Sequence, residues 1–277
     1  MNRRQLMRYA QTSVLAAMGT GLASGLHTYQ AQAQAKKNQP QAKPKAQPQN
    51  ALSIQWLGHT CFLLTGGNQK LQRVLVNPFR PGGCTAGYRE PKLATDLILV
   101  SSSLLDEGAI EVVTGDPKLL YEAGPYQVDG IRFEGIKTDH DRVGGRRFGS
   151  NVVWRWTQAG INILHLGGIA APVTLEQKIL MLKNRPDVLF LPVGGSAKAY
   201  TPQEAKQAVQ ELNPRLIIPT HYRTQAAKEN ACDLVPVQEF LALMEGIPVR
   251  RLGNTITVKS TDLPSQGPEI AVLSYKF

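Results

Sequence analysis

Short apolar runs separated by turn residues fill the chain from Ile54 to about residue 164, and helical periodicity is scarce there. Such runs, bounded by Gly, Pro, Asn and Asp, are typical of β-strands. The pattern predicts strands at IQWLG, CFLL, RVLVNPF, DLILV, EVV, IRFEGI, NVVWRW and INIL.

The second half changes character, because helical and strand-like segments alternate. We predict helices over 175–184, 201–212 and 237–245, strands over 187–193 and 215–219, and further strands in VRRLGNTITVKS and IAVLSYKF. Thr201-Pro-Gln-Glu204 has the spacing of a capping box with proline in the first turn, and Asn213-Pro214 ends that helix. Alternation of this kind is typical of an α/β fold.

Polar residues gather where the predicted strands end. They are Ser101–Glu107, Asp139-His140-Asp141, His165 and His221. Ligands of α/β sheets bind beyond the carboxyl ends of strands. One histidine after a strand is more often structural than functional, but four such segments together favour a site.

The positive charge is concentrated at the N-terminus. Residues 1–50 hold seven of the 31 Lys and Arg and none of the 21 Asp and Glu, so only +3 of the formal +10 belongs to residues 51–277. The domain has no basic stripe interleaved with aromatic residues, and we therefore expect no nucleic-acid partner.

The N-terminus has the parts of an export signal. NRRQLMR resembles a twin-arginine motif, a glycine-broken apolar stretch follows, and AQAQA ends at Ala35. We predict a signal over 1–35 read by the twin-arginine export machinery, a flexible linker over 36–50 and one domain over 51–277. The protein is expected in the periplasm or the thylakoid lumen, with no stable membrane span after signal removal.

The three cysteines, Cys61, Cys84 and Cys232, lack metal-site spacing. They are too few for a disulfide scaffold, so we expect buried thiols with at most one disulfide.

Seven segments carry a family resemblance. WLGHTCFLL, LVNPF, DLILVSSSLLDE, the stretch from VVTGDPKLL to RRFGSN, INILHLGGI, DVLFLPVGG and TPQEAKQAVQELNPRLIIPTHY resemble, in order, the metallo-β-lactamase superfamily in its ascorbate-phosphate-lactonase-like branch. The resemblance covers about residues 51–225. It implies an α/β fold of the four-layer αββα sandwich type, with a metal site at one edge.

The metal motifs depart from the family pattern. The first family motif, His-x-His-x-Asp-His, reads Ser102-Ser103-Leu104-Leu105-Asp106-Glu107, so only the aspartate remains. His140 and His221 match later metal histidines, but HLGG has Gly168 in place of the bridging aspartate. Catalytic zinc needs about three nitrogen, sulfur or carboxylate ligands. The resemblance implies a ligand set of Asp106, Glu107, His140 and His221 for one divalent metal, zinc or similar, bound sub-stoichiometrically or absent.

Three functions are compatible with these residues. The first is an inactive or weakly active hydrolase relative, a pseudoenzyme, whose cleft binds a small anionic molecule near Arg142, Arg146 and Arg147. The second is a single-metal hydrolase of a lactone or phosphodiester-type ester, with Asp106, His140 and His221 catalytic. A metal-free Ser-His-Asp hydrolase using Ser101–Ser103 is the third. His59 and His165 are expected to orient loops rather than bind metal.

Overall fold

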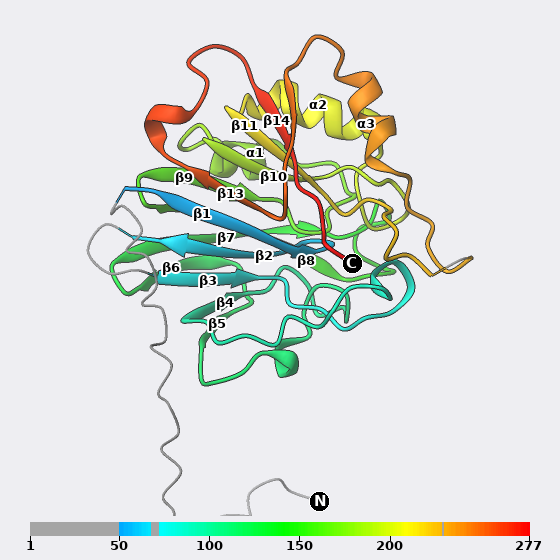
Figure 1. The fold of residues 1–277 in the computed structure, drawn as a ribbon, viewed down its shortest axis with the longest axis horizontal. Coiled ribbons are helices and arrows are strands. Elements are labelled where there is room, and N and C mark those ends of the chain that lie inside the picture. Colours follow the sequence, from blue (N-terminus) through cyan, green and yellow to red (C-terminus); the bar gives the residue numbers. More distant parts are fainter. Residues whose placement is uncertain (1–49, 68–71, 229) are drawn as a thin grey trace, which may run out of the picture. The chain divides into compact units, whose positions relative to one another are not determined.

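The computed structural model describes residues 50–67, 72–228 and 230–277. The predicted signal and nearly all of the predicted linker lie outside these residues. Two β-sheets form the centre of the described domain, and their strands run side by side through it (Figure 1). Among the described residues, no helix is long and apolar enough to cross a bilayer.

The first sheet has six strands and is mixed. Its order is β13 (Thr255–Val258), β1 (Leu52–Gly58), β2 (Cys61–Gly66), β3 (Gln72–Val76), β4 (Leu97–Leu99) and β5 (Lys118–Leu120). The pairs β13–β1, β1–β2 and β2–β3 are antiparallel, whereas β3–β4 and β4–β5 are parallel. In β1, buried and half-buried residues alternate strictly, as a strand packed on one face requires.

The second sheet has eight strands. Its order is β12 (Val249–Arg251), β14 (Glu269–Val272), β11 (Leu216–Thr220), β10 (Val188–Pro192), β9 (Ile161–His165), β8 (Ser150–Gln158), β7 (Ile131–Asp139) and β6 (Gly124–Val128). The strands from β12 to β9 are parallel to one another. Every residue of β10 and β11 is buried, because parallel strands in the middle of a sheet are covered on both faces.

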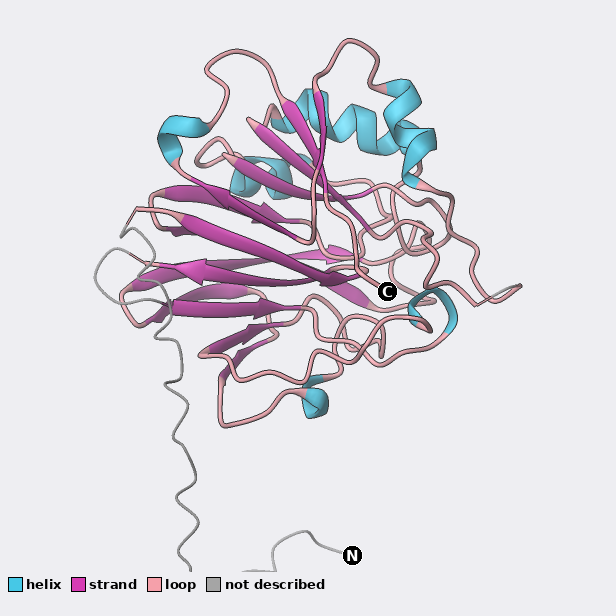
Figure 2. Cartoon of the chain, viewed as in Figure 1, coloured by secondary structure: helices cyan, strands magenta, loops and turns pink. Residues whose placement is uncertain are grey.

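Three α-helices connect the parallel strands of the second sheet (Figure 2). They are α1 (Leu175–Met181), α2 (Pro202–Leu212) and α3 (Val237–Leu243). The predicted capping box begins α2: the Thr201 side chain accepts from the Glu204 amide, and the Glu204 carboxylate accepts from the Thr201 amide. The predicted αββα class is confirmed. The first sheet carries only the short 3-10 helices η1 (Gly83–Thr85), η2 (Ile110–Val112) and η3 (Ser260–Asp262) in its described connections.

One strand prediction is wrong. EVV, at 111–113, lies in and just after η2 instead of in a sheet. Ala109 donates its amide to Pro78 O, which fixes this segment against the loop after β3. A three-residue apolar run carries too little pattern to separate a strand from a helical turn.

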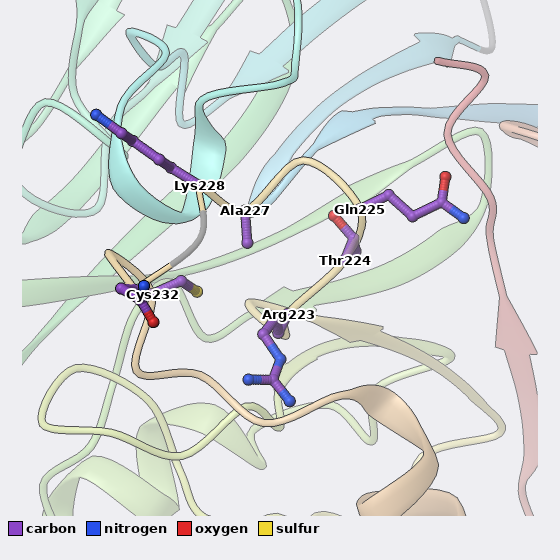
Figure 3. A pocket seen from close by; sticks show the side chains of 7 residues that line it. Arg223, Thr224, Gln225, Ala227, Lys228 and Cys232 are labelled. Atoms are coloured by element: carbon purple, nitrogen blue, oxygen red, sulfur yellow. The ribbon is translucent and has the colours of Figure 1, made fainter.

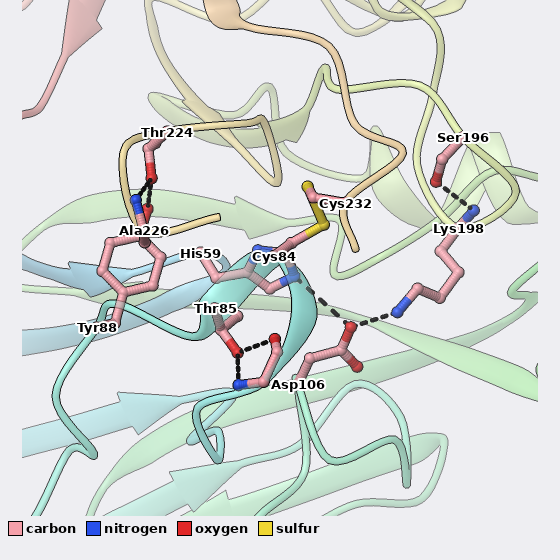
Figure 4. Close-up of a disulfide and its surroundings, with 11 residues drawn as sticks. His59, Cys84, Thr85, Tyr88, Asp106, Ser196, Lys198, Thr224, Ala226 and Cys232 are labelled. Carbon is pink, nitrogen blue, oxygen red and sulfur yellow. Dashed lines mark hydrogen bonds and ion pairs between the residues drawn. A yellow bond between two sulfur atoms is a disulfide. The ribbon is translucent and has the colours of Figure 1, made fainter. Parts of the chain in front are cut away.

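A disulfide joins two distant loops. Cys84 in η1 is bonded to Cys232, 148 residues later, and Cys61 is a buried free thiol in β2. The bridge ties the loop after β3 to the loop that follows His221. One disulfide agrees with the prediction, and its position holds together loops that approach the same edge of the two sheets (Figure 4).

Candidate metal centre

Loops at one edge of the two sheets bring the predicted site residues together. Asp106 and Glu107 lie in the loop after β4, His140 directly follows β7, and His221 directly follows β11. The turn between β1 and β2 adds His59. The carboxyl ends of strands from both sheets therefore supply the site, as expected for this type of fold.

The backbone around the site is unusual for non-glycine residues. Positive φ angles occur at His59 (54°), His221 (52°), Asn77 (50°) and Ser196 (65°), all in loops at this edge. Such conformations cost free energy and persist where the surrounding structure enforces them. At His59 and His221 they aim the imidazole rings at each other, with ring centroids 4.1 Å apart.

The first group of side chains is His59, Asp106 and His221, whose potential ligand atoms all lie within 4.8 Å of one another. His59 Nε2 is 3.8 Å from Asp106 Oδ2 (Figure 4). Both histidines are about 1% exposed, and His59 Nε2 and both ring nitrogens of His221 have no hydrogen-bond partner. Two imidazoles and one carboxylate, with buried nitrogens left unpaired, fit one divalent cation with an open position.

The second group is a hydrogen-bonded network around Glu107. The Glu107 carboxylate is buried, accepts from Ser102 Oγ at 2.9 Å, and lies 3.0 Å from His140 Nε2. Its other oxygen is 3.4 Å from His221 Nδ1. The structure thus divides the predicted four-residue ligand set: Asp106 and His221 join His59, whereas Glu107 and His140 are bonded to each other.

Electrostatics within the second group favour an ion pair. Burial alone would lower the pKa of His140, but the hydrogen bond and charge of Glu107 outweigh it and raise that pKa above 6.5. Burial would raise the pKa of Glu107, yet its hydrogen bond to His140 and the nearby ring of His221 hold it well below 4.5. In contrast, burial and the neighbouring His221 lower the pKa of His59 to about 3. Glu107 therefore favours the protonated form of His140, whereas burial favours the neutral form of His59.

Two metals do not fit the residues present. A Cβ atom added to Gly168 would lie 2.4 Å from Glu107 Oε1 and 2.7 Å from Oε2, so the Glu107 carboxylate fills the space beside this glycine. Gly168 is where the resemblance places the bridging aspartate. The Glu107 carboxylate therefore lies beside the position that the resemblance gives to the bridging aspartate, and it is 3.0 Å from His140 Nε2.

Lys198 is a site residue that the sequence analysis missed. Its ammonium group forms an ion pair with Asp106 Oδ2, the oxygen that faces His59 (Figure 4). Burial would raise the pKa of Asp106, but its basic neighbours, Lys198 among them, outweigh it and hold that pKa below its ordinary value. Two carboxylates, Asp106 and Glu107, are thereby balanced by Lys198 and by the imidazolium of His140.

The other candidate residues have structural partners. Buried His165 lies 3.2 Å from Thr60 O through Nε2, and its Nδ1 accepts from the Gly167 amide, so it orients loops as expected. For His59 that expectation stays a prediction, and its Nε2 faces Asp106 without a hydrogen bond. Ser102 donates to a carboxylate instead of an imidazole, which does not support a Ser-His-Asp nucleophile.

The mouth of the site is basic and partly aromatic. Asp106 and Lys198 are partly exposed, at 21% and 24%, whereas His59, Glu107, His140 and His221 are buried. The Phe148 ring lies near two cations, with Arg147 Cζ 4.8 Å and Lys198 Nζ 5.8 Å from its centroid. Arg142, which was expected to bind an anion, instead pairs with Glu204 and with two backbone carbonyls.

A separate cavity of about 590 Å³ lies along the loop after His221. Arg223, Thr224, Gln225 and Lys228 line it together with Cys232 of the disulfide (Figure 3). None of its lining residues belongs to the metal-capable group. The cavity is therefore distinct from the mouth at Asp106 and Lys198.

An αββα sandwich with histidines and carboxylates at the edge of its two sheets defines a metallo-hydrolase scaffold. A family model described as a beta-lactamase superfamily domain matches residues 53–221, and the chain belongs to the metallo-β-lactamase superfamily. The superfamily assignment made from the sequence is confirmed.

The relatives include metal-dependent hydrolases. One from Thermococcus onnurineus is 27% identical over 198 residues, covering 62% of this chain and 85% of the relative. Another, from Methanoregula boonei, is 29% identical over 203 residues, covering 62% and 83%. A solved structure from Thermotoga maritima, described as a Zn-dependent hydrolase of the superfamily, has a TM-score of 0.62 and 29% identity over 80% of this chain and 98% of that chain.

The Glu107–His140 pair generates a prediction about stability. Glu107→Gln should lower the free energy of unfolding by roughly 3 kcal/mol near neutral pH, because it leaves one partner of a buried ion pair uncompensated. Urea unfolding of both proteins measures this difference. Glu245→Gln, at an exposed position, is the matched control and should change stability little.

The difference in the free energy of unfolding between the wild type and Glu107→Gln should also depend on pH. The raised pKa of His140 gives a contribution that is complete below pH 6.5 and is lost as the pH rises through its folded-state value. The lowered pKa of Glu107 gives a second contribution to stability, which is complete above pH 4.5 and is lost as the pH falls through the folded-state value. Stabilisation by the pair should therefore be greatest between these values. A difference that stays constant from acid to alkaline pH would contradict the ion pair.

Proposed function

We propose that the protein is an exported metallo-β-lactamase-fold relative that has lost two-metal hydrolysis and uses the mouth of its former active site to bind a small anionic molecule. The observation that carries this proposal is the Glu107 carboxylate. It fills the space beside Gly168 and is bonded to His140, where the superfamily resemblance calls for metal ligands. A buried carboxylate in that place, with one oxygen bonded to Ser102 and His140, supports a centre without a second metal.

An anionic ligand is supported by the charges at the mouth. Lys198 is partly exposed, Arg147 is exposed, and the Phe148 ring lies beside both cations. Guanidinium and ammonium groups donate hydrogen bonds to carboxylate and phosphate oxygens, and an aromatic ring adds apolar contact area. A small carboxylate or phosphate ester has the matching chemistry.

A second candidate function is single-metal hydrolysis of a lactone or phosphodiester-type ester. The grouping of His59, Asp106 and His221 favours it, since three protein ligands and one open position are typical of catalytic zinc. A divalent cation held there would polarise an ester carbonyl or phosphoryl oxygen. Lys198 would then lie beside the bound anion and orient it.

Metal analysis separates these functions from two-metal hydrolysis. Mature protein isolated from its own compartment without chelators should contain at most one equivalent of zinc. It should not turn over lactone or phosphodiester substrates in the manner of a two-metal enzyme. Elemental analysis and turnover assays measure both properties. Two equivalents of zinc, with turnover abolished by Asp106→Ala, would contradict the proposal.

Restoring the lost ligands provides the matched variants. The combined change Ser102→His, Leu104→His, Glu107→His and Gly168→Asp should recover metal binding, because affinity depends on a complete ligand set. Gly168→Asp alone should destabilise the fold, since its Cβ would meet the Glu107 carboxylate. Adding Glu107→His should relieve that clash. Equal stability of the two variants would show that Glu107 does not fill this space.

Export is supported by the signal-like N-terminus and by the disulfide between Cys84 and Cys232. Disulfides persist in oxidising compartments such as the periplasm and are rare in the cytosol. We predict cleavage after Ala35, so mass spectrometry of the mature protein should find Lys36 at its N-terminus. Replacing Arg3 and Arg4 by Lys should block export. A mature protein that retains both arginines in the cytosol would overturn this proposal.

A further inference from the structure

We propose that Lys198 is an intramolecular counter-ion that competes with a divalent cation for Asp106, so that removing its charge opens a single-cation site formed by His59, Asp106 and His221. The competition arises at one atom. Asp106 Oδ2 is the oxygen paired with the Lys198 ammonium group, and it is also the oxygen 3.8 Å from His59 Nε2. A cation held between Asp106 and His59 needs that oxygen.

The buried part of this site is already assembled. His59 and His221 are about 1% exposed, and their unpaired nitrogens lie close to Asp106. These nitrogens have no hydrogen-bond partner, although unpaired buried polar atoms cost free energy. Both residues adopt positive φ angles, a backbone conformation that persists where the surrounding structure enforces it. Asp106 is therefore the potential ligand that is not free to bind a cation, because its carboxylate is paired with Lys198.

Lys198 is positioned by a braced loop and is unlike a mobile surface lysine. Ser196 adopts a positive φ of 65°, and its hydroxyl accepts from the Lys198 amide at 3.3 Å. Arg142 donates to the carbonyls of Ser196 and Ala199 at 2.8 and 3.1 Å. The loop that presents Lys198 is thus clamped on both sides of the lysine.

Arg142, which holds this loop through two hydrogen bonds, is itself bonded to a residue of helix α2. Arg142 Nε donates to Glu204 Oε1 at 3.0 Å, and Glu204 is the residue that closes the capping box of α2 with Thr201. Rigid support of this kind is what holds a functional side chain in a defined place. Arg142 therefore supports the loop that presents Lys198.

The competition is tested by cobalt binding to the full mature chain. Lys198→Met keeps an unbranched apolar stem beside Phe148 and removes the charge. It should bind one equivalent of Co²⁺ at least tenfold more tightly than the wild type, as measured by calorimetry and by visible absorption of the bound ion. Lys198→Gln provides a second neutral side chain. Lys198→Arg keeps the charge and should remain at the wild-type affinity.

Two controls assign the effect to this site. Lys183→Met removes one positive charge at an exposed position and should leave the affinity unchanged. In the Lys198→Met background, either His59→Ala or Asp106→Asn should abolish the gain. Thermal unfolding of each variant without metal establishes that it is folded.

Equal cobalt affinity in the wild type and in both neutral variants would overturn the proposal, and so would a gain that survives Asp106→Asn. The inference rests on the proposed loss of the second metal, but its failure is distinguishable. If the proposed function is wrong, the wild type contains two equivalents of zinc and shows turnover. If only the competition by Lys198 is wrong, the cobalt affinity of the single site is the same with and without the Lys198 charge.

Discussion

Two carboxylates are largely buried at the edge of the β-sandwich, and their negative charges need positive partners. The arrangement of the other site residues depends on how this chain supplies those partners. Isolated buried carboxylates are costly, and they persist only with paired charges, hydrogen bonds or bound cations. Here the imidazolium of His140 balances Glu107, and the ammonium group of Lys198 balances Asp106. Under the proposed function, these two side chains supply positive charge that metal ions supply in a metallo-hydrolase.

The sizes of two side chains make this pairing of charges possible. Glycine at position 168 makes room, and Glu107 extends into it from the opposite loop. Its carboxylate then reaches His140, and Ser102 donates to the same oxygen. The two-sheet fold of the superfamily is present around these residues. Scaffold and chemistry can therefore diverge independently.

Periodicity and capping signals predicted most elements of the second sheet and its helices, because these segments are long and patterned. The loops after the strands likewise indicated Asp106, His140 and His221. The partners of these residues were not accessible to sequence reasoning. His59 resembled a structural histidine, and Lys198 follows a glycine turn with no motif around it. Their roles arise from contacts between residues that are distant in the chain, as does the filling of space beside Gly168 by Glu107.

Anomalous diffraction at the zinc edge, from crystals of the mature protein grown with excess zinc, tests the account most directly. A protein whose Glu107 and His140 neutralise each other should show no anomalous peak bonded to either side chain. At most one peak should appear, between His59, Asp106 and His221, with Lys198 displaced from Asp106. A zinc ion coordinated by both Glu107 and His140 would contradict the replacement of the second metal by an internal ion pair.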